Sequence, residues 1–383
     1  MLTEQTLDRM RREADPLADA VAADVIGARS GGASSTHSAG RSAFAEWTGI
    51  SGAIPRGLHD EIDRYLDQTG HVPDWHDAEL VARGEVVYGA YGPECMIVLL
   101  LRSLPAGYVQ AHIASTLHST ARMTEESGSL GQLTRRVLET LQFLIYVMAP
   151  RGLQAGGVGI QAAQRVRLIH AAIRTYTTRA PSYDPTGPAP INQEELLMTM
   201  LTFSVLVVDG LRSLGVTLEP ADEDGILHMW RLVGHQMGIR EEYMPTDMAD
   251  ARAMWEVIYR RNWGPTPEGV ELTSALLDYV RSITPWRVLR FAPGLLLRYL
   301  NGQPLSRELG VRSLIQPVES IAQFGLRLPF AILSNVELIL RQATRWSRSF
   351  NLRLLQGLLL EWNDRKKVTF DIPPSLRDAW GMK

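Results

Sequence analysis

Apolar residues recur at helical steps along most of the chain, and this spacing restricts the possible folds more than any other feature. Ile97, Leu100 and Leu101 stand three and four positions apart, and the same spacing returns over residues 141–148. Residues with this period lie on one face of an α-helix. The alternation expected of a strand is scarce, and residues 367–370 are the only short candidate. The sequence therefore predicts an all-α fold.

Helix ends are marked most clearly in the middle of the chain. Asn192 is a good N-cap residue, and Glu195 three positions later completes a capping-box pattern. Gly215 supplies the expected glycine stop, so we predict one helix from Asn192 to about Gly215. The glycine-rich stretch 150–159 predicts a turn between two further helices.

Other breaks in the helical pattern are short. They lie at residues 31–35, at the proline-rich stretch 181–190 and at residues 263–267. None has the length of a domain linker, and no internal repeat is present. We therefore expect one helical domain over residues 1–383, with a core at about 75–262 and a C-terminal helical layer at about 263–383.

The amino-acid composition excludes several classes of function. The chain has 383 residues, of which 45% are apolar, and its formal net charge is -3. A balance of this kind gives no basic field for nucleic acid, so we predict no nucleic-acid partner. Cys95 is the single cysteine, which excludes a disulfide framework, a cysteine-based zinc site and an iron–sulfur cluster within one chain. We expect it to be a small core residue.

The first residues are polar and partly acidic, without the apolar run of a secretory signal, so a cytoplasmic location is expected. The apolar stretches 143–148 and 196–208 are shorter than the ~20 residues that cross a bilayer, which predicts no transmembrane segment. Residues 327–362 combine leucine, isoleucine and phenylalanine with arginines. Packing on the core is favoured for this segment, and a basic amphipathic surface for a membrane or partner is the alternative.

Nine histidines are present, but the sequence holds no HExxH motif and no histidine pair at i,i+4. A histidine-based zinc site is therefore poorly supported. His228 and His235 are seven positions apart and can share a helix face. We interpret them as partly buried, hydrogen-bonded structural residues.

His170 has a more suggestive setting, on a helix face with Ala163, Val166 and Ile173. A proximal haem ligand requires a neutral imidazole on a rigid helix, with small or apolar neighbours that let the flat macrocycle approach. A lone histidine among apolar residues is more often structural. Both interpretations remain open on this evidence.

Arginines flank His170 within about a turn. They are Arg165, Arg167 and Arg174, and haem propionates require cations of this kind. We predict that Arg167 and Arg174 contact the cofactor.

Arg136, Glu139 and Thr140 lie at i, i+3 and i+4 and so share one helix face. Arg136 and Glu139 could pair on a solvated surface, which is the commoner arrangement. The helix is strongly apolar, however, and polar groups buried on such a helix must be satisfied or functional. Facing an iron site, the three side chains could orient dioxygen and move protons.

Taken in order, these motifs resemble the MpaB-like family, which includes the latex-clearing proteins. The most specific part is Arg136-x-x-Glu139-Thr140 followed by residues 166–174. The resemblance covers most of the chain, and its other segments are residues 15–19, 83–85, 91–93, 191–196 and 228–231.

The resemblance implies a globin-like helical core with additional helices around one non-covalent haem b. It implies His170 as the proximal iron ligand, and Arg136 and Thr140 match the distal arginine and threonine of latex-clearing proteins. Those enzymes cleave the carbon–carbon double bonds of polyisoprene with dioxygen.

The sequence departs from that family in three respects. Glu139 stands where rubber-cleaving members can have a lysine that binds iron, so Glu139 is expected to act as a general acid or base. Their catalytic glutamate has no counterpart among Thr116, Ser119 and Thr120, which precede Glu125. The chain also lacks their export signal, which favours a substrate smaller than rubber.

We therefore predict a haem b oxygenase that uses dioxygen on a small hydrophobic substrate, with an olefin as one candidate. His170 is the predicted iron ligand, and Arg136, Glu139 and Thr140 are the predicted catalytic residues. A peroxidase or peroxygenase and a non-enzymatic haem carrier or sensor are the alternatives that keep the haem. A helical lipid-binding or partner-binding protein is the alternative without it.

Overall fold

The computed structural model describes residues 2–27, 60–122, 129–181, 183–284 and 290–311. Helices account for nearly all regular structure in these ranges, which confirms the all-α prediction. An antiparallel bridge between Gln110 and Trp263 is the only β-type pairing there. The elements are α1 (Glu4–Met10), α2 (Pro16–Gly27), α4 (Asp60–Thr69), α5 (Ala78–Ala90), α6 (Gly92–Val98), the π-helix η1 (Leu99–Ser103), α7 (Leu104–Tyr108), α8 (Ala111–Arg122), α9 (Ser129–Val147), α10 (Val158–Arg179), α11 (Gln193–Ser213), α12 (Pro220–Gln236), the 3-10 helix η2 (Glu241–Tyr243), α13 (Met248–Asn262), α14 (Pro267–Ile283) and α15 (Ala292–Glu308).

Helix α11 begins and ends as its sequence predicts. The Asn192 side chain accepts a hydrogen bond from the Glu195 amide, and the Glu195 carboxylate accepts one from the Asn192 amide, which completes the capping box. At the other end Gly215 adopts a φ of 94°, and the Val216 amide donates to the Leu211 carbonyl group. This is the Schellman arrangement that glycine favours.

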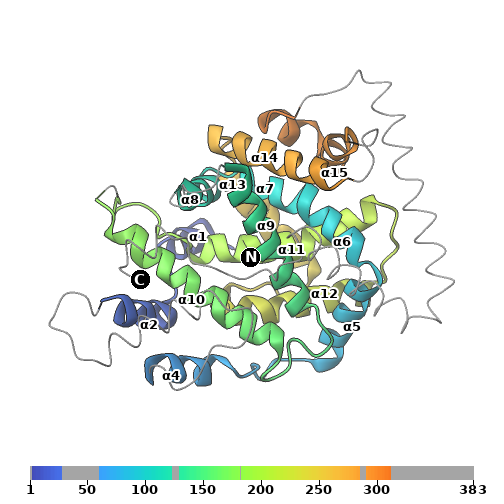
Figure 1. Ribbon diagram of the computed structural model, residues 1–383. Coiled ribbons are helices and arrows are strands. Elements are labelled where there is room, and N and C mark those ends of the chain that lie inside the picture. Colours follow the sequence, from blue (N-terminus) through green and yellow to red (C-terminus); the bar gives the residue numbers. More distant parts are fainter. Residues whose placement is uncertain (1, 28–59, 123–128, 182, 285–289, 312–383) are drawn as a thin grey trace.

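The core is organised around α11. Most of its residues are buried, and it packs against α12, α13, α6, α7 and η1. In Figure 1 α11 lies in the middle of the molecule, α14 and α15 lie at one end, and α4 and α5 lie at the other. A helix that is apolar on nearly all sides is the expected centre of such a fold.

Two glycines bring α5 and α12 into close contact, and these two helices form the most extensive pair in the fold. A β-carbon at Gly84 would lie 2.7 Å from the carbonyl oxygen of Gly225, and one at Gly225 would lie 3.0 Å from the amide nitrogen of Gly84. Only glycine allows this approach of the two backbones.

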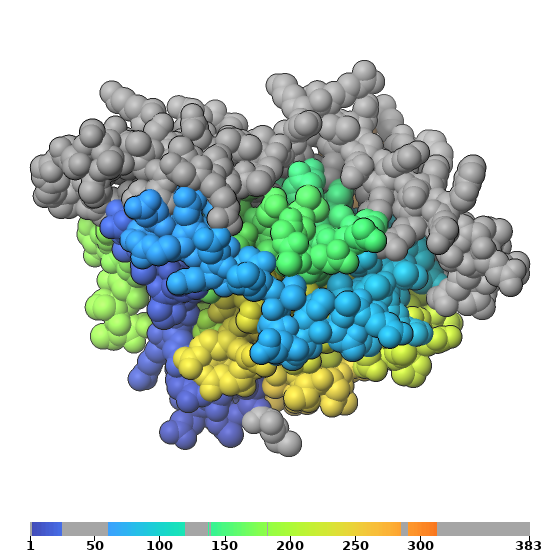
Figure 2. Space-filling model, turned by 90° about the horizontal axis from the view of Figure 1, so that it is seen from below, coloured from blue at the N-terminus to red at the C-terminus, as the bar shows by residue number. Residues whose placement is uncertain are grey.

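The N-terminal helices lie against segments that are distant in sequence. Helix α2 packs along α10 and also contacts α4. Figure 2 shows the N-terminal residues in dark blue beside α4 and α5 in lighter blue, with residues of the α12–α13 region in yellow next to them.

Within the described ranges α11 is long and apolar enough to cross a bilayer, but 78% of its apolar window is buried inside the protein. The helix is thus longer than the stretch 196–208 suggested. Helix α5 and the segment Gly92–Tyr108 pass the same test only as a pair, and they are bent by 86° at their junction. Helix α11 passes the test because it is a buried, apolar core helix.

Several sequence predictions concern residues outside the described ranges. They are the loop at 31–35, the strand candidate at 367–370, the arginine-containing segment 327–362 and most of the C-terminal layer. The breaks at 150–159, 181–190 and 263–267 do lie between helices, as predicted. The division of the chain into a core and a C-terminal layer stays a prediction.

Candidate functional site

Helices α9 and α10 form an antiparallel pair joined by the turn at 148–157. The two helices are in close contact at Gly159, where a β-carbon would lie 2.9 Å from the Val147 Cα. Arg136 is eleven residues before Val147, and His170 is eleven residues after Gly159. Both are therefore about 16 Å along their helices from the contact. In Figure 1 the two helices approach at their linked ends and separate toward their other ends.

On α9 the predicted polar residues share a face, as their spacing requires. Glu139 and Thr140 are half-buried, and each takes part in a polar interaction. Of Arg136 the structure describes the helical backbone but not the side chain. Glu139 and Thr140 are thus partly covered by the protein and do not lie on a fully solvated surface.

His170 carries a buried ring nitrogen without a partner. Its residue is half-buried as a whole, but Nδ1 is inaccessible and has no hydrogen-bond partner among the described residues. Burial, together with the positive charge of Arg174, lowers the pKa of the imidazole to about 3, although Asp15 opposes the shift. The ring is therefore neutral at physiological pH, which is the form that ligates a metal.

The surface beside His170 is apolar and incompletely covered. Val166, Ile169 and Ile173 lie within one turn of it, and all three are half-buried. Ala163 and Ala171 are fully buried. Ala163, Val166 and Ile173 share the His170 face of α10, and they are the small and aliphatic side chains expected beside a flat ligand.

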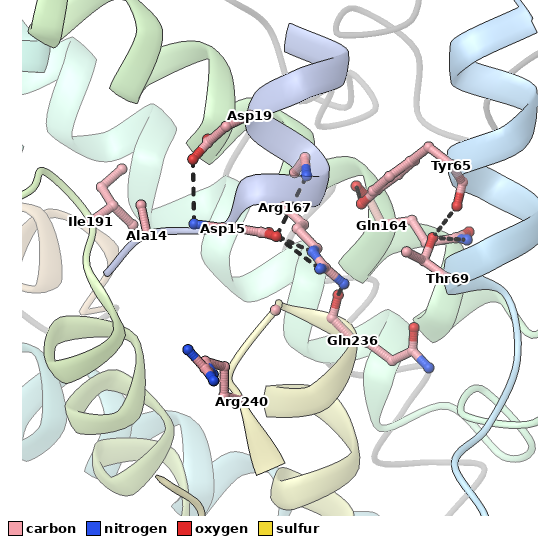
Figure 3. A network of polar contacts seen from close by, with 12 residues as sticks. Ala14, Asp15, Asp19, Tyr65, Thr69, Gln164, Arg167, Ile191, Gln236 and Arg240 are labelled. Carbon is pink, nitrogen blue, oxygen red and sulfur yellow. Dashed lines mark hydrogen bonds and ion pairs between the residues drawn. The ribbon is translucent and has the colours of Figure 1, made fainter. Parts of the chain in front are cut away.

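Arg167 and Arg174 lie one turn before and one turn after His170, and both bind carboxylates of the N-terminal segment. Figure 3 shows the contact of Arg167 with Asp15. Arg167 Nε and Nη2 donate to the two Asp15 carboxylate oxygens over 2.5 and 2.9 Å. Arg174 Nε donates to Asp19 Oδ1 over 2.6 Å. Sequence reasoning missed both partners, although Asp15 and Asp19 stand in the segment 15–19 that carries part of the family resemblance.

The ion pairs leave the two arginines with different remaining donors. Arg167 Nη1 lies 3.5 Å from the Gln236 carbonyl oxygen, so this guanidinium is largely satisfied by protein groups (Figure 3). Arg174 Nη1 donates to the Ile191 carbonyl group, but its buried Nη2 has no partner in the described part of the chain. Arg174 therefore has a buried nitrogen with no partner among the described residues, whereas each nitrogen of Arg167 has at least one.

The remaining histidine predictions are borne out in part. His228 is buried, and its Nε2 accepts a hydrogen bond from the Asp77 amide over 2.9 Å, which agrees with a structural role. His235 contacts the ring of Trp75 edge to face at 5.9 Å. Among the described residues no group of three or more histidine, cysteine, aspartate or glutamate side chains could hold a metal ion.

Cys95 is a core residue, as predicted, with 3% of its surface exposed. Burial raises the pKa of its thiol well above the usual value, so the reactive thiolate is disfavoured.

The residues around His170 fit a haem better than an all-protein metal site. Haem brings four nitrogen ligands of its own and requires one neutral imidazole with apolar flanks. The unpartnered Nδ1 of His170 and the half-buried residues Val166, Ile169 and Ile173 meet that requirement.

Comparison with known proteins identifies the fold and the family. The chain is 22% identical to latex clearing protein LCP, solved in its closed state, with a TM-score of 0.73 over 95% of this chain and 94% of that one. This likeness establishes the shared fold. The rubber oxygenase of Streptomyces sp. (strain K30) is 24% identical over 333 residues, which cover 86% of this chain and 79% of that protein.

A family model described as "ER-bound oxygenase mpaB/B'/Rubber oxygenase, catalytic domain" matches residues 94–382, about three quarters of the chain. The matched range contains α9, α10 and α11, and with them all six predicted site residues. The chain therefore belongs to this family of oxygenase catalytic domains, and it is an enzyme of the oxygenase class.

Proposed function

We propose that the protein is a haem b-dependent oxygenase that uses dioxygen on a small hydrophobic substrate, with an olefin as one candidate. The observation that carries the proposal is the neutral imidazole of His170, whose buried Nδ1 has no hydrogen-bond partner among the described residues, within an oxygenase family fold. The relative named rubber oxygenase supports an apolar and unsaturated substrate, because rubber is a hydrocarbon polymer that retains double bonds.

His170 is the residue that would hold the haem iron. A neutral imidazole donates its lone pair without first losing a proton, and α10 holds the ring on a rigid element. Haem, when bound, supplies the redox chemistry that dioxygen activation requires. All other roles belong to side chains of this chain.

Arg174 is the better of the two predicted contacts with the haem propionates. Its Nη2 donor is buried and free of partners among the described residues, whereas the donors of Arg167 are directed at Asp15 and Gln236. Arg167 would act by fixing the orientation of α10.

On α9 Arg136 and Thr140 would donate hydrogen bonds to dioxygen, and the Glu139 carboxyl group would move protons. Counted from the contact at Gly159, Arg136 would be level with His170 along the helices, and Glu139 and Thr140 would be one turn nearer the linked ends. Donors aimed at a position where negative charge develops stabilise a transition state.

A peroxygenase is the second candidate, and the half-buried carboxyl group of Glu139 on the same helix face as Arg136 favours it. Glu139 would accept the proton of a peroxide, and Arg136 would stabilise the departing oxygen. Turnover driven by hydrogen peroxide without a reductant distinguishes this activity from the oxygenase.

The test is the absorption spectrum of the purified protein supplied with hemin, oxidised and then reduced with dithionite. The wild type should give a Soret band that is lost or strongly altered in His170→Ala. His235→Ala removes another half-buried histidine and should leave the band unchanged.

Absence of a Soret band in the hemin-supplied wild type would refute the haem assignment and favour a helical lipid-binding or partner-binding protein. A band that survives His170→Ala but not His235→Ala would move the ligand to α12. A stable haem complex that consumes neither dioxygen nor peroxide with any apolar substrate would identify a carrier or sensor.

A further inference from the structure

Arg165 is a buried cation without a counter-charge. Its residue is 1% exposed, and its Nε and Nη2 atoms have no hydrogen-bond partner in the part of the chain that the structure describes. The next two arginines on α10, Arg167 and Arg174, are each paired with an aspartate. Arg165 thus differs from its neighbours in lacking the carboxylate that they have.

The charge on Arg165 persists although it is buried. Burial lowers the pKa of the guanidinium to about 10, and the ionisable group that faces it is the Tyr146 phenol. A phenol is neutral at pH 7 and does not balance a full positive charge. An uncompensated buried charge costs several kcal/mol, so an anion from outside the described chain is the expected partner.

The two free atoms of Arg165 are those that bind a carboxylate in this same protein. Arg167 uses Nε and Nη2 to contact both oxygens of Asp15. Arg252 likewise directs Nε and Nη2 at Asp209. In Arg165 this side of the guanidinium, which matches the geometry of a carboxylate, is unused.

Arg165 lies between the linked ends of α9 and α10. It is five residues before His170, about 7.5 Å along the helix and about 140° around it. Helical side chains incline toward the N-terminus, which directs the guanidinium of Arg165 toward Tyr146 on the last turn of α9. Arg165 and His170 thus face different sides of α10, and a ligand that contacts both must extend around the edge of this helix.

We propose that Arg165, with the Tyr146 hydroxyl group beside it, binds a carboxylate of the ligand held between α9 and α10. The carboxylate belongs either to a haem propionate or to an apolar acid bound as substrate. The first source rests on the proposed function, and the second does not require haem.

The experiment compares acids with their esters in wild type, Arg165→Met and Arg165→Lys. The probes are hemin against hemin dimethyl ester, measured by absorbance titration, and oleic acid against methyl oleate, measured by calorimetry on hemin-free protein. The matched control is Arg252→Met, which removes an arginine with the same pair of donor atoms far from the site.

We expect the wild type to prefer one of the two acids over its ester by at least about tenfold, because charged hydrogen bonds each contribute roughly 1.5–3 kcal/mol. Arg165→Met should abolish that preference, and Arg165→Lys, which keeps the charge but not the two-atom contact, should retain part of it. Arg252→Met should bind as the wild type does.

The outcomes separate the two sources. Loss of preference for hemin identifies a propionate, and loss of preference for oleic acid with unchanged hemin binding identifies a substrate carboxylate. If neither preference depends on Arg165, the proposal is overturned. If the wild type binds no hemin, only the haem assignment is refuted. The comparison of oleic acid with methyl oleate still tests the role of Arg165. Should Arg165→Met fail to fold, the Lys variant carries the same comparison.

Discussion

At the residue scale, Glu195 makes stability depend on pH. Burial raises the pKa of its carboxyl group from 4.5 to about 7, against the hydrogen bonds from the Asn192 and Ile191 amides. Between these values the folded state binds more protons than the unfolded state, so the free energy of unfolding falls as pH rises from about 4.5 to about 7. Glu195→Gln should flatten this slope in urea unfolding at pH 5, 6 and 7.

Glu256→Gln is the control for Glu195→Gln. It changes an exposed carboxylate that pairs with Arg260 at i,i+4, an interaction of about 0.3–0.5 kcal/mol. An unchanged pH slope in Glu195→Gln would show that another group is responsible.

The ion pair between Arg167 and Asp15 is the second feature at this scale. The side chains are 11% and 3% exposed, so removal of one partner leaves the other charge buried. Arg167→Met should lower the free energy of unfolding by roughly 3–5 kcal/mol. Arg281→Met breaks an exposed pair with Asp278 and should cost less than about 1 kcal/mol. If Arg167→Met and Arg281→Met lowered the free energy of unfolding equally in chemical denaturation, this account would be contradicted.

At the scale of elements, the crossing of α5 and α12 depends on two glycines. A methyl group at Gly84 would collide with the Gly225 backbone, which cannot move aside as a side chain does. Gly84→Ala should therefore destabilise the protein by about 1–3 kcal/mol. Thermal unfolding measures the effect.

Gly107→Ala is the matched control within α7. The nearest atom to a β-carbon there is an Ile113 methyl group at 3.9 Å, which is ordinary contact. Alanine is better than glycine in a helix by up to about 1 kcal/mol, so this variant should be as stable as the wild type or more so. A melting temperature that falls equally in both variants would refute the crossing argument.

At the scale of the whole molecule, the N-terminal segment connects three helices that are distant in sequence. Asp15 binds Arg167 of α10, the Gln193 side chain of α11 donates to the Ala14 carbonyl group, and the same side chain donates to the Gly238 carbonyl group after α12. Figure 3 shows Asp15 where α10 and the end of α12 meet.

Asp15→Asn should therefore reduce the local stability of several segments that are distant in sequence. It removes the charge that holds Arg167, so hydrogen exchange should accelerate in α1, α2 and α10. Helix α14 contacts α8, α9, α7 and α15 and should keep its protection. Asp278→Asn, which affects an exposed pair on α14, is the control and should leave exchange in α10 unchanged. Acceleration confined to α1 would show that the connection is only local.

Much of the fold was predictable because its signals are local. The period of apolar residues predicts helices, and the reciprocal hydrogen bonds of Asn192 and Glu195 set a helix start within four residues. The glycine-rich stretch 150–159 likewise predicts the turn that brings α9 back along α10. The position of Glu139 and Thr140 one turn after Arg136, on its side of the helix, follows from spacing alone.

The charge balance at the site depends on tertiary structure. Arg167 and Arg174 find their carboxylates 152 and 155 positions away, and nothing near them in sequence indicates those partners. Arg165 stands two residues from Arg167 and has no such partner among the described residues. Local patterns in the sequence specify which residues form helices and which of them share a face. The neutralisation of buried charges is specified by the folded arrangement instead, because electrostatic pairing depends on distance in space and on the exclusion of water.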